Sequence, residues 1–322
     1  MLNRNVLHGQ GIWFRGFSLL FLLCWGIPLH LLAGSPDDGK QNPYLVREFT
    51  LDGPGVLKTS TLAGNIDVEK VVDSNEVRVE LYVERGFALW SGSRNLDNYR
   101  INVLKRGNEI IASVEEKKRS GRLFGDAVNF NFKVYVPERM STELQTRGGN
   151  ISLSGVKGDQ LAKTSGGNIR LHRLTGKVGA YTTGGDIGIS YCKGTIFAQT
   201  EGGQINARHS EGELRLRTGG GDITSQQITG SFIARAGAGN IRSHFADVGQ
   251  GISIETSAGN ITVELPVGAG LDIFASGSYI DSQSLENFSG TQSSRLLEGR
   301  LNGGSIPVRL QTSSGNVTIT MN

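Results

Sequence analysis

Cysteine and proline are scarce in this sequence of 322 residues, which holds only 2 cysteines and 7 prolines. Cys24 falls in an N-terminal stretch that we expect to be removed, so Cys192 would remain alone and no internal disulfide could form. Stability must then come from packing, which a chain of this size can supply. Glycine is abundant at 46 residues, and high glycine without proline excludes a collagen helix and a proline-rich linker.

A surplus of charge of either sign is also absent. The sequence has 33 lysines and arginines against 30 acids, a formal net charge of +3. Removal of the first 35 residues takes away Arg4 and Arg15 and no acid, which lowers the balance to +1. A chain this close to neutrality has no electrostatic attraction to nucleic acid or anionic lipid, so we expect no nucleic acid as a partner.

The N-terminus has the composition of an export signal. Its two arginines supply positive charge, residues 17–33 form a nearly unbroken apolar run, and small residues follow at 33–35. We interpret residues 1–35 as a signal peptide and residues 36–41 as a short flexible segment.

A retained anchor helix is the alternative interpretation of this N-terminus. Pro28 and His30 interrupt the apolar run, which is short for a bilayer core of ~30 Å. We therefore expect cleavage near residues 34–36 and no stable membrane span afterwards.

The strongest signal is a motif of glycine, then Asn, Asp or Gln, then isoleucine, which recurs six times at a constant step of 18 residues. Its glycines are Gly149, Gly167, Gly185, Gly203, Gly221 and Gly239. A period held without slippage means that every unit takes the same place in a coil, which is the signature of a solenoid.

Alternation of period two predicts two short strands in each unit, separated by glycine-rich turns. With the motif isoleucine as position 1, apolar residues recur at positions 3, 6, 10 and 12, and threonine recurs at position 14. Cys192 and Ala246 belong to the column at position 6. Positions 7 and 13 are polar, which excludes the left-handed hexapeptide helix. We predict an all-β, single-domain parallel β-solenoid (β-helix) with about 18 residues per coil, right-handed because parallel crossovers default to that hand.

The regular repeat covers only part of the predicted solenoid, which extends over residues 42–322. Its parts are irregular N-terminal coils at 42–140, regular coils at 141–265 and irregular C-terminal coils at 266–322. Two insertions interrupt the first part. We interpret the apolar insertion at 86–95 as a cap over the open end of the stack, with a binding tip as the alternative, and the role of the basic insertion at 117–122 stays open.

Several stretches carry a resemblance to known proteins. They are LKTSTLAGNI at 57–66, VRVE at 77–80, VP at 136–137, the repeated T-x-G-G-[ND]-I units, and LNGG at 301–304 followed by LQTSSGNVTI at 310–319. In this layout the chain resembles a bacterial family of exported β-strand-repeat proteins labelled putative adhesins, a domain of unknown function. The resemblance implies the solenoid fold and an adhesin-like role. It transfers no catalytic residue, because the family has none agreed.

The residues that follow the repeated glycines form a conspicuous polar column. Asn and Asp suit this place because they tolerate left-handed backbone and hydrogen-bond to nearby backbone groups. We expect a structural turn ladder of Asn150, Asn168, Asp186, Gln204, Asp222 and Asn240. Calcium is the alternative, but it needs about six to eight oxygen ligands, and the two carboxylates of the column lie two coils, or about 10 Å, apart. We expect no metal and no cofactor.

No catalytic cluster is evident along the regular coils. The acids scatter over different positions, so none share a column on adjacent coils, as a glycan-cleaving enzyme would need. His172, His209 and His244 lie about two coils apart, too far to share a zinc ion. Cys192 falls in an apolar column, where it packs rather than reacts. We predict no catalytic residue.

The outward face offers the best candidate for binding. Position 13 carries a stripe of long polar and aromatic side chains, and position 11 adds three apolar ones. The stripe is Lys163, Tyr181, Gln199, Arg217 and Arg235, and its neighbours are Leu161, Phe197 and Ile233. Such a mixture suits repeated weak contacts with a polymer or a protein. An ordinary solvated sheet face is the alternative interpretation.

These observations predict an exported, non-enzymatic envelope or surface protein that acts as an adhesin-like binding or scaffolding module. Its location would be the periplasm, the outer surface or the medium, and its partner an envelope protein or a polysaccharide. Two alternatives stay open: a carbohydrate-active β-helix enzyme, and a periplasmic signalling or assembly partner.

Overall fold

The computed structural model describes residues 42–85, 96–117, 128–283 and 285–322, all within the compact unit Gln41–Asn322. These residues form strands and turns, with no helix among them. The strands join in one sheet of 24 strands. The predicted all-β class is therefore confirmed.

Four of the segments discussed above lie partly or wholly outside the described residues. They are the predicted signal peptide at 1–35, the segment 36–41, the insertion at 86–95 and all but the first residue of the insertion at 117–122.

The middle of the chain forms a regular stack. Its strands are β8 (Met140–Thr146), β9 (Ile151–Ser154), β10 (Lys157–Lys163), β11 (Ile169–His172), β12 (Thr175–Thr182), β13 (Ile187–Ser190), β14 (Lys193–Thr200), β15 (Ile205–Thr218), β16 (Ile223–Ala236), β17 (Ile241–Thr256) and β18 (Ile261–Leu265). Each strand pairs in parallel with the one a repeat further on, as Ile169 pairs with Ile187 and Lys157 with Thr175.

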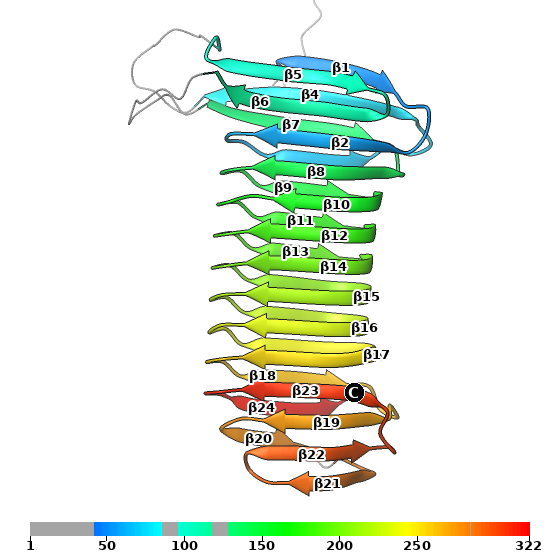
Figure 1. The fold of residues 1–322 in the computed structure, drawn as a ribbon, viewed down its shortest axis with the longest axis vertical. Coiled ribbons are helices and arrows are strands. Elements are labelled where there is room, and N and C mark those ends of the chain that lie inside the picture. Colours follow the sequence, from blue (N-terminus) through cyan, green and yellow to red (C-terminus); the bar gives the residue numbers. More distant parts are fainter. Residues whose placement is uncertain (1–41, 86–95, 118–127, 284) are drawn as a thin grey trace, which may run out of the picture. The chain divides into compact units, whose positions relative to one another are not determined.

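Two columns of strands result, joined by turns at both edges (Figure 1). One column, which we call the β10 face, contains β8, β10, β12 and β14. The other, the β11 face, contains β9, β11 and β13. The longer strands β15 and β16 take part in both columns, since each covers a whole coil.

The N-terminal end is not a continuation of this order. Its strands are β1 (Leu45–Thr50), β2 (Gly55–Thr61), β3 (Ile66–Lys70), β4 (Glu76–Arg85), β5 (Tyr99–Arg106), β6 (Glu109–Glu116) and β7 (Val128–Val136). The coil β2–β3 lies between two later segments, because β2 pairs in parallel with both β6 and β8, and β3 with both β7 and β9. Strands β1, β4 and β5 pair antiparallel.

The C-terminal end is interleaved in the same way. Its strands are β19 (Leu271–Ser276), β20 (Tyr279–Ser282), β21 (Phe288–Gln292), β22 (Leu296–Leu301), β23 (Ile306–Thr312) and β24 (Asn316–Met321). The last coil, β23–β24, lies between β17–β18 and β19–β20. Strands β21 and β22 add an antiparallel ribbon outside β19. The irregular ends do continue the stack, but the predicted parallel pairing is wrong for their antiparallel strands.

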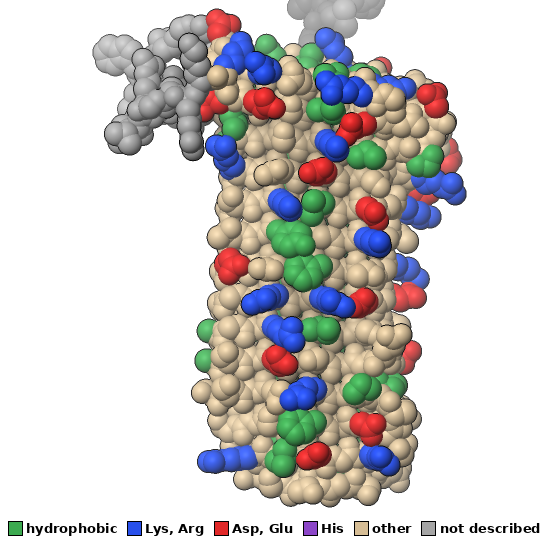
Figure 2. All heavy atoms as spheres, viewed as in Figure 1, with side chains coloured by type: hydrophobic (Ala, Val, Ile, Leu, Met, Phe, Trp, Pro, Cys, Tyr) green, Lys and Arg blue, Asp and Glu red, His purple; other side chains and the backbone are tan. Residues whose placement is uncertain are grey.

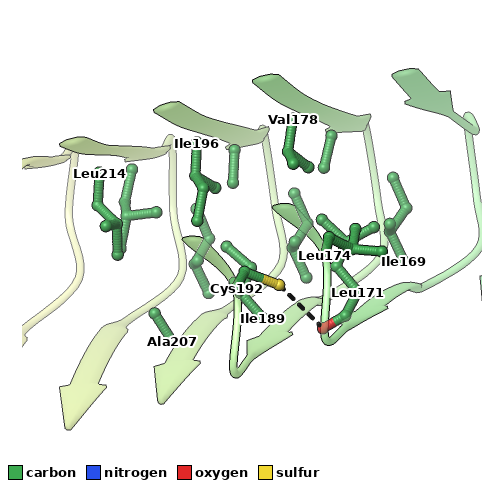
Figure 3. Packing of buried hydrophobic residues seen from close by; sticks show 14 of the residues in the cluster. Ile169, Leu171, Leu174, Val178, Ile189, Cys192, Ile196, Ala207 and Leu214 are labelled. Atoms are coloured by element: carbon green, nitrogen blue, oxygen red, sulfur yellow. Dashed lines mark hydrogen bonds between the residues drawn. The ribbon is translucent and has the colours of Figure 1, made fainter. Parts of the chain in front are cut away.

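Apolar side chains from both faces meet in one continuous core. The position-1 isoleucines are fully buried, namely Ile151, Ile169, Ile187, Ile205, Ile223 and Ile241. Figure 3 shows Leu171, Leu174 and Ile189 packed around Cys192 between the two columns. Each buried large aliphatic stabilises the fold by ~1.5–3 kcal/mol, and the gain exists only when coils stack.

The regular register ends within β17. Phe245, and not Ala246, pairs with Ile228 and is fully buried, while Ala246 is exposed. Register shifts between Ser225 and Phe232 account for the change, since β17 is longer than the strand it pairs with. The expected place of Ala246 in the apolar column is therefore wrong.

Two columns of glycine make the tight stacking possible. A Cβ on Gly185 would lie 1.9 Å from the carbonyl oxygen of Gly167, so no larger residue fits between adjacent coils. At the other edge of the stack, Gly176 has a φ of 128°, a conformation that only glycine adopts readily.

Candidate functional site

The polar column after the stacked glycines is a hydrogen-bond ladder along one edge of the stack. The Oδ1 atom of Asn150 accepts a hydrogen bond of 2.8 Å from the backbone N–H of Asn168, and Asn168 does the same for Asp186. In the same way, Asp186 accepts from the backbone N–H of Gln204, and Asp222 accepts from that of Asn240. The ladder also includes residues that we did not assign to it from the sequence, namely Asn65, Asn131, Asn260 and Asn316.

Of the two reasons that we gave for this ladder, hydrogen bonding to nearby backbone groups is confirmed, but left-handed backbone is wrong. None of its six predicted members has a positive φ. The left-handed backbone lies instead at the fifth position of four successive repeats, with φ of 52° at Arg173, 56° at Tyr191, 47° at His209 and 55° at Gln227. Asn and Asp therefore recur in the ladder because their side chains are short acceptors, and not because of their backbone preference.

A second ladder runs inside the first, formed by the threonines of position 14. The Oγ1 atom of Thr182 donates to the carbonyl of Gly167 at 2.9 Å and accepts from the N–H of Gly185 at 3.2 Å. The same pair of bonds recurs at Thr146, Thr164, Thr200 and Thr218. Ala236 interrupts this ladder, since it has no hydroxyl.

The five residues of the predicted partner-binding face lie one above another on the β10 face. Lys163 pairs with Tyr181, Tyr181 with Gln199, Gln199 with Arg217, and Arg217 with Arg235. The column continues beyond the predicted residues to Glu255, Gln311 and Ser276. Figure 2 shows charged and hydrophobic side chains gathered in a column along this side of the stack.

Contacts between these side chains divide the column into an aromatic part and a charged part. The Lys163 ammonium lies 5.7 Å from the centre of the Tyr181 ring, and that ring lies 5.4 Å from Phe197. Further along, Gln199 donates to Glu201 at 3.1 Å, and Arg235 forms an ion pair of 3.0 Å with Glu255. Arg217 has no ion pair within the part of the chain that the structure describes.

Two connected grooves follow this column. The long groove has a volume of about 540 Å³, and its polar walls are Gln199, Glu201, Arg217, Arg235, Glu255 and Gln311. The short groove has a volume of about 330 Å³ and is lined by Gln145, Lys163, Tyr181, Gln199 and Glu201, among others. Because both grooves share Gln199 and Glu201, they form one depression along the stack.

An apolar groove of about 490 Å³ lies beside them. Its walls include Val56, Leu161, Val178 and Phe197. Gly179 keeps it open, since a Cβ there would lie 3.2 Å from both Leu161 and Tyr181. Phe197 therefore faces this groove and also contacts the aromatic part of the column.

The remaining candidates for chemistry are dispersed. The Tyr191 ring stacks on His209 at 4.9 Å, and His172 lies against the edge of the same tyrosine at 5.7 Å. Within the described ranges, no group of three or more His, Cys, Asp or Glu side chains could hold a metal ion. Burial raises the pKa of the Cys192 thiol, which makes it a poor nucleophile at neutral pH.

The segments that the structure describes contain no helix long and apolar enough to cross a membrane.

Comparison with known families gives a match over most of the chain. The profile of a family described as Toastrack DUF4097 matches residues 90–320. A search of curated protein sequences finds no match.

Three solved structures are similar to the chain. One is a putative cell adhesion protein from Clostridium sporogenes, 11% identical, with a TM-score of 0.23 over 87% of this chain and 100% of that one. A putative adhesin from Bacteroides fragilis is 14% identical, with a TM-score of 0.36 over 86% and 96%. A putative lipid binding protein from Parabacteroides distasonis is 11% identical, with a TM-score of 0.25 over 87% and 97%. Because these TM-scores are low, the three likenesses do not establish a ligand.

Proposed function

The chain belongs to the Toastrack DUF4097 family, and from this premise we propose that it is an exported, non-enzymatic envelope or surface module that binds a partner through the β10 face. The family match confirms the resemblance expected from the sequence. We also propose that the coils wind right-handed with about 18 residues each, as parallel crossovers favour. The location outside the cytoplasm is part of the same proposal.

The observation that carries the proposal is the alignment of Lys163, Tyr181, Gln199, Arg217 and Arg235 beside a continuous depression. A rigid sheet fixes their spacing, so they present a preformed surface that needs little ordering on binding. The depression and the exposed Tyr181 ring support this binding role over an ordinary solvated sheet face. Concave surfaces with a few convergent polar groups are where ligands bind most often.

The distribution of acids supports a binding role over glycan cleavage. Glu201 and Glu255 both line the long groove, but they stand three coils apart, which is roughly 14 Å at the usual strand spacing. Two catalytic carboxyl groups of a glycosidase lie within about 10 Å of each other. Glu255 is also held by Arg235, and Glu201 by Gln199.

The binding role is tested by sedimentation of the mature protein with bacterial envelope fractions. The variant R217A/R235A removes two guanidinium groups from the β10 face, and we expect at least about a tenfold loss of affinity, since arginine is enriched among the residues that dominate binding energy. The matched control is R208A/R242A, which removes two exposed arginines from the β11 face. Equal behaviour of the two variants, at unchanged Tm, would contradict the proposal.

The proposed export is tested independently by cell fractionation with N-terminal sequencing. We expect a mature protein outside the cytoplasm that begins near residues 34–36. Recovery of the intact N-terminus in the membrane fraction would instead indicate a retained anchor.

A further inference from the structure

We infer that the long groove binds an uncharged linear glycan. This inference rests on the proposed binding role of the β10 face and names the chemistry of its ligand. Three observations support it. The groove lies where the repeat is interrupted, its floor is formed by backbone, and its walls carry equal numbers of positive and negative side chains.

The long groove is a local departure from the repeat and not part of it. At the fifteenth position, successive coils carry Ser165, Thr183 and Glu201 and then Gly219 and Gly237, and the last three of these residues line the groove. The turn changes with them. The N–H of Glu201 bonds the carbonyl of Thr183, but the N–H of Gly219 bonds the carbonyl of Thr200, one residue earlier in its repeat. Departures from an otherwise consistent pattern concentrate at functional sites.

The floor of the groove is backbone. A Cβ on Gly219 would lie 2.4 Å from the carbonyl oxygen of Glu201, and one on Gly237 would lie 2.2 Å from that of Gly219. Side chains are therefore excluded from the floor at both places. Ala236, which also lines the groove, is the residue that interrupts the threonine ladder. Three departures from the repeat thus coincide at one depression.

The walls favour a neutral ligand. They carry two cations, Arg217 and Arg235, and two anions, Glu201 and Glu255. The Arg235–Glu255 ion pair neutralises half of this charge within the protein. A charged polymer would find no complementary field along such a groove, whereas hydroxyl groups can donate to the carboxylates and accept from the guanidinium and carboxamide groups.

The dimensions and the backbone pairing favour a glycan over an extended peptide. Five strand spacings separate Gln199 from Ser276, which gives a groove length of roughly 24 Å at the usual spacing. An extended peptide gains affinity mainly by adding a strand to a free sheet edge. Here the floor N–H groups of Gly219 and Gly237 already bond the preceding coil. Recognition must therefore come from side chains, as it does for polyhydroxylated chains.

An aromatic surface continues the groove at one end. The Tyr181 ring is 36% exposed and lies in the short groove, which shares Gln199 and Glu201 with the long one. The apolar face of a sugar ring can pack on such a side chain, while the phenol hydroxyl remains free for hydrogen bonds. A chain of several sugars could therefore contact both grooves at once.

The test is calorimetric titration of the mature protein with uncharged linear hexasaccharides from glucans, xylans, mannans and galactans. Oligogalacturonate, a strand-forming peptide and phosphatidylcholine vesicles serve as the competing probes. We expect at least one neutral hexasaccharide to bind, with an affinity that changes little with salt because no counterions are released. R217Q should lower that affinity about tenfold, and R208Q on the β11 face should leave it unchanged.

Tighter binding of oligogalacturonate, of the peptide or of the vesicles than of every neutral glycan would overturn the inference, as would no glycan binding at all. Such a result is distinguishable from failure of the proposed function. If R217A/R235A still weakens binding to envelope fractions relative to R208A/R242A, the face binds a partner of another chemistry. If the two variants bind equally, the face itself is not the binding surface.

Discussion

The middle coils and the two ends of the stack are built differently. From β10 to β17, each coil lies on the coil that precedes it in the sequence. At the ends the order is interleaved. The side chain of Asn65 therefore accepts a hydrogen bond from the backbone N–H of Asn150, and the side chain of Asn260 accepts one from that of Asn316. The middle therefore depends on contacts one repeat apart, whereas the ends depend on contacts between distant segments.

The interleaved order at the ends reduces the number of unpaired strand edges in the stack. A stack that simply stopped would leave a full row of unpaired backbone groups for another chain to join. Interleaving places the motif coils β2–β3 and β23–β24 inside the stack, with strands on both sides. Among the described residues, β1, β5 and β21 at the ends each pair antiparallel on one side, and β20 pairs in parallel on one side with β24. Interleaving brings together segments that are far apart in the sequence. The loss of chain entropy on folding is therefore larger at the ends than in the middle coils.

The largest effect should follow from a change within the middle turns. Gly185→Ala would place a Cβ 1.9 Å from the Gly167 carbonyl oxygen, so the two coils must separate. We expect a loss of more than about 4 kcal/mol in the free energy of unfolding, or failure to fold. The neighbouring Gly184→Ala is the control, because its Cβ would meet no atom closer than 3.9 Å. Chemical denaturation should separate the two variants, and similar midpoints would refute the stacking constraint.

A buried charge should distinguish the middle from the ends. Ile169→Asp and Val317→Asp both place a carboxylate at a fully buried site at the start of a motif strand. Each should cost about 3–5 kcal/mol, as uncompensated buried charges do. We expect hydrogen exchange to show opening of the whole middle stack for Ile169→Asp, and opening confined to the segments around β19–β24 for Val317→Asp. Uniform loss of protection in both variants would mean that ends and middle unfold as one unit.

The same contrast explains how far the sequence could be interpreted. The motif isoleucines and the threonines were assignable because a strict period converts sequence position into inside and outside. Phe245 was missed because the register shifts within β17, where the step from Gly239 to the next motif glycine, Gly259, is 20 residues and not 18. The interleaved ends were missed because the partners of β2 follow it by long stretches that no period links. At the candidate site, the column residues were assignable, but the hollow depends on a turn change at Gly219 and Gly237.

The threonine ladder should respond more modestly, and in both directions. Thr182→Ala removes the bonds to the carbonyl of Gly167 and the N–H of Gly185, and we expect a loss of about 1–3 kcal/mol because both backbone groups are buried. The converse change, Ala236→Thr, restores a hydroxyl between Thr218 and Thr256 and should stabilise by about 1 kcal/mol. Thermal unfolding of the two variants measures both changes in stability. If Ala236→Thr destabilises, the turn at the long groove holds a geometry that the ladder cannot adopt.

The smallest effect should come from Cys192, which makes the middle stack pH-sensitive and provides a probe of it. Burial raises the pKa of its thiol in the folded state. The associated stability is fully present below the unfolded thiol pKa of about 8.5 and is lost as the pH rises through the folded pKa. We expect unfolding free energy to fall by about 1 kcal/mol or less between neutral pH and pH of about 9, and Cys192→Val to remove that fall.

Because Cys192 lies in the middle, its alkylation rate should also stay low in Val317→Asp and rise in Thr182→Ala. Rapid alkylation of Val317→Asp would mean that the interleaved C-terminal coil holds the middle closed.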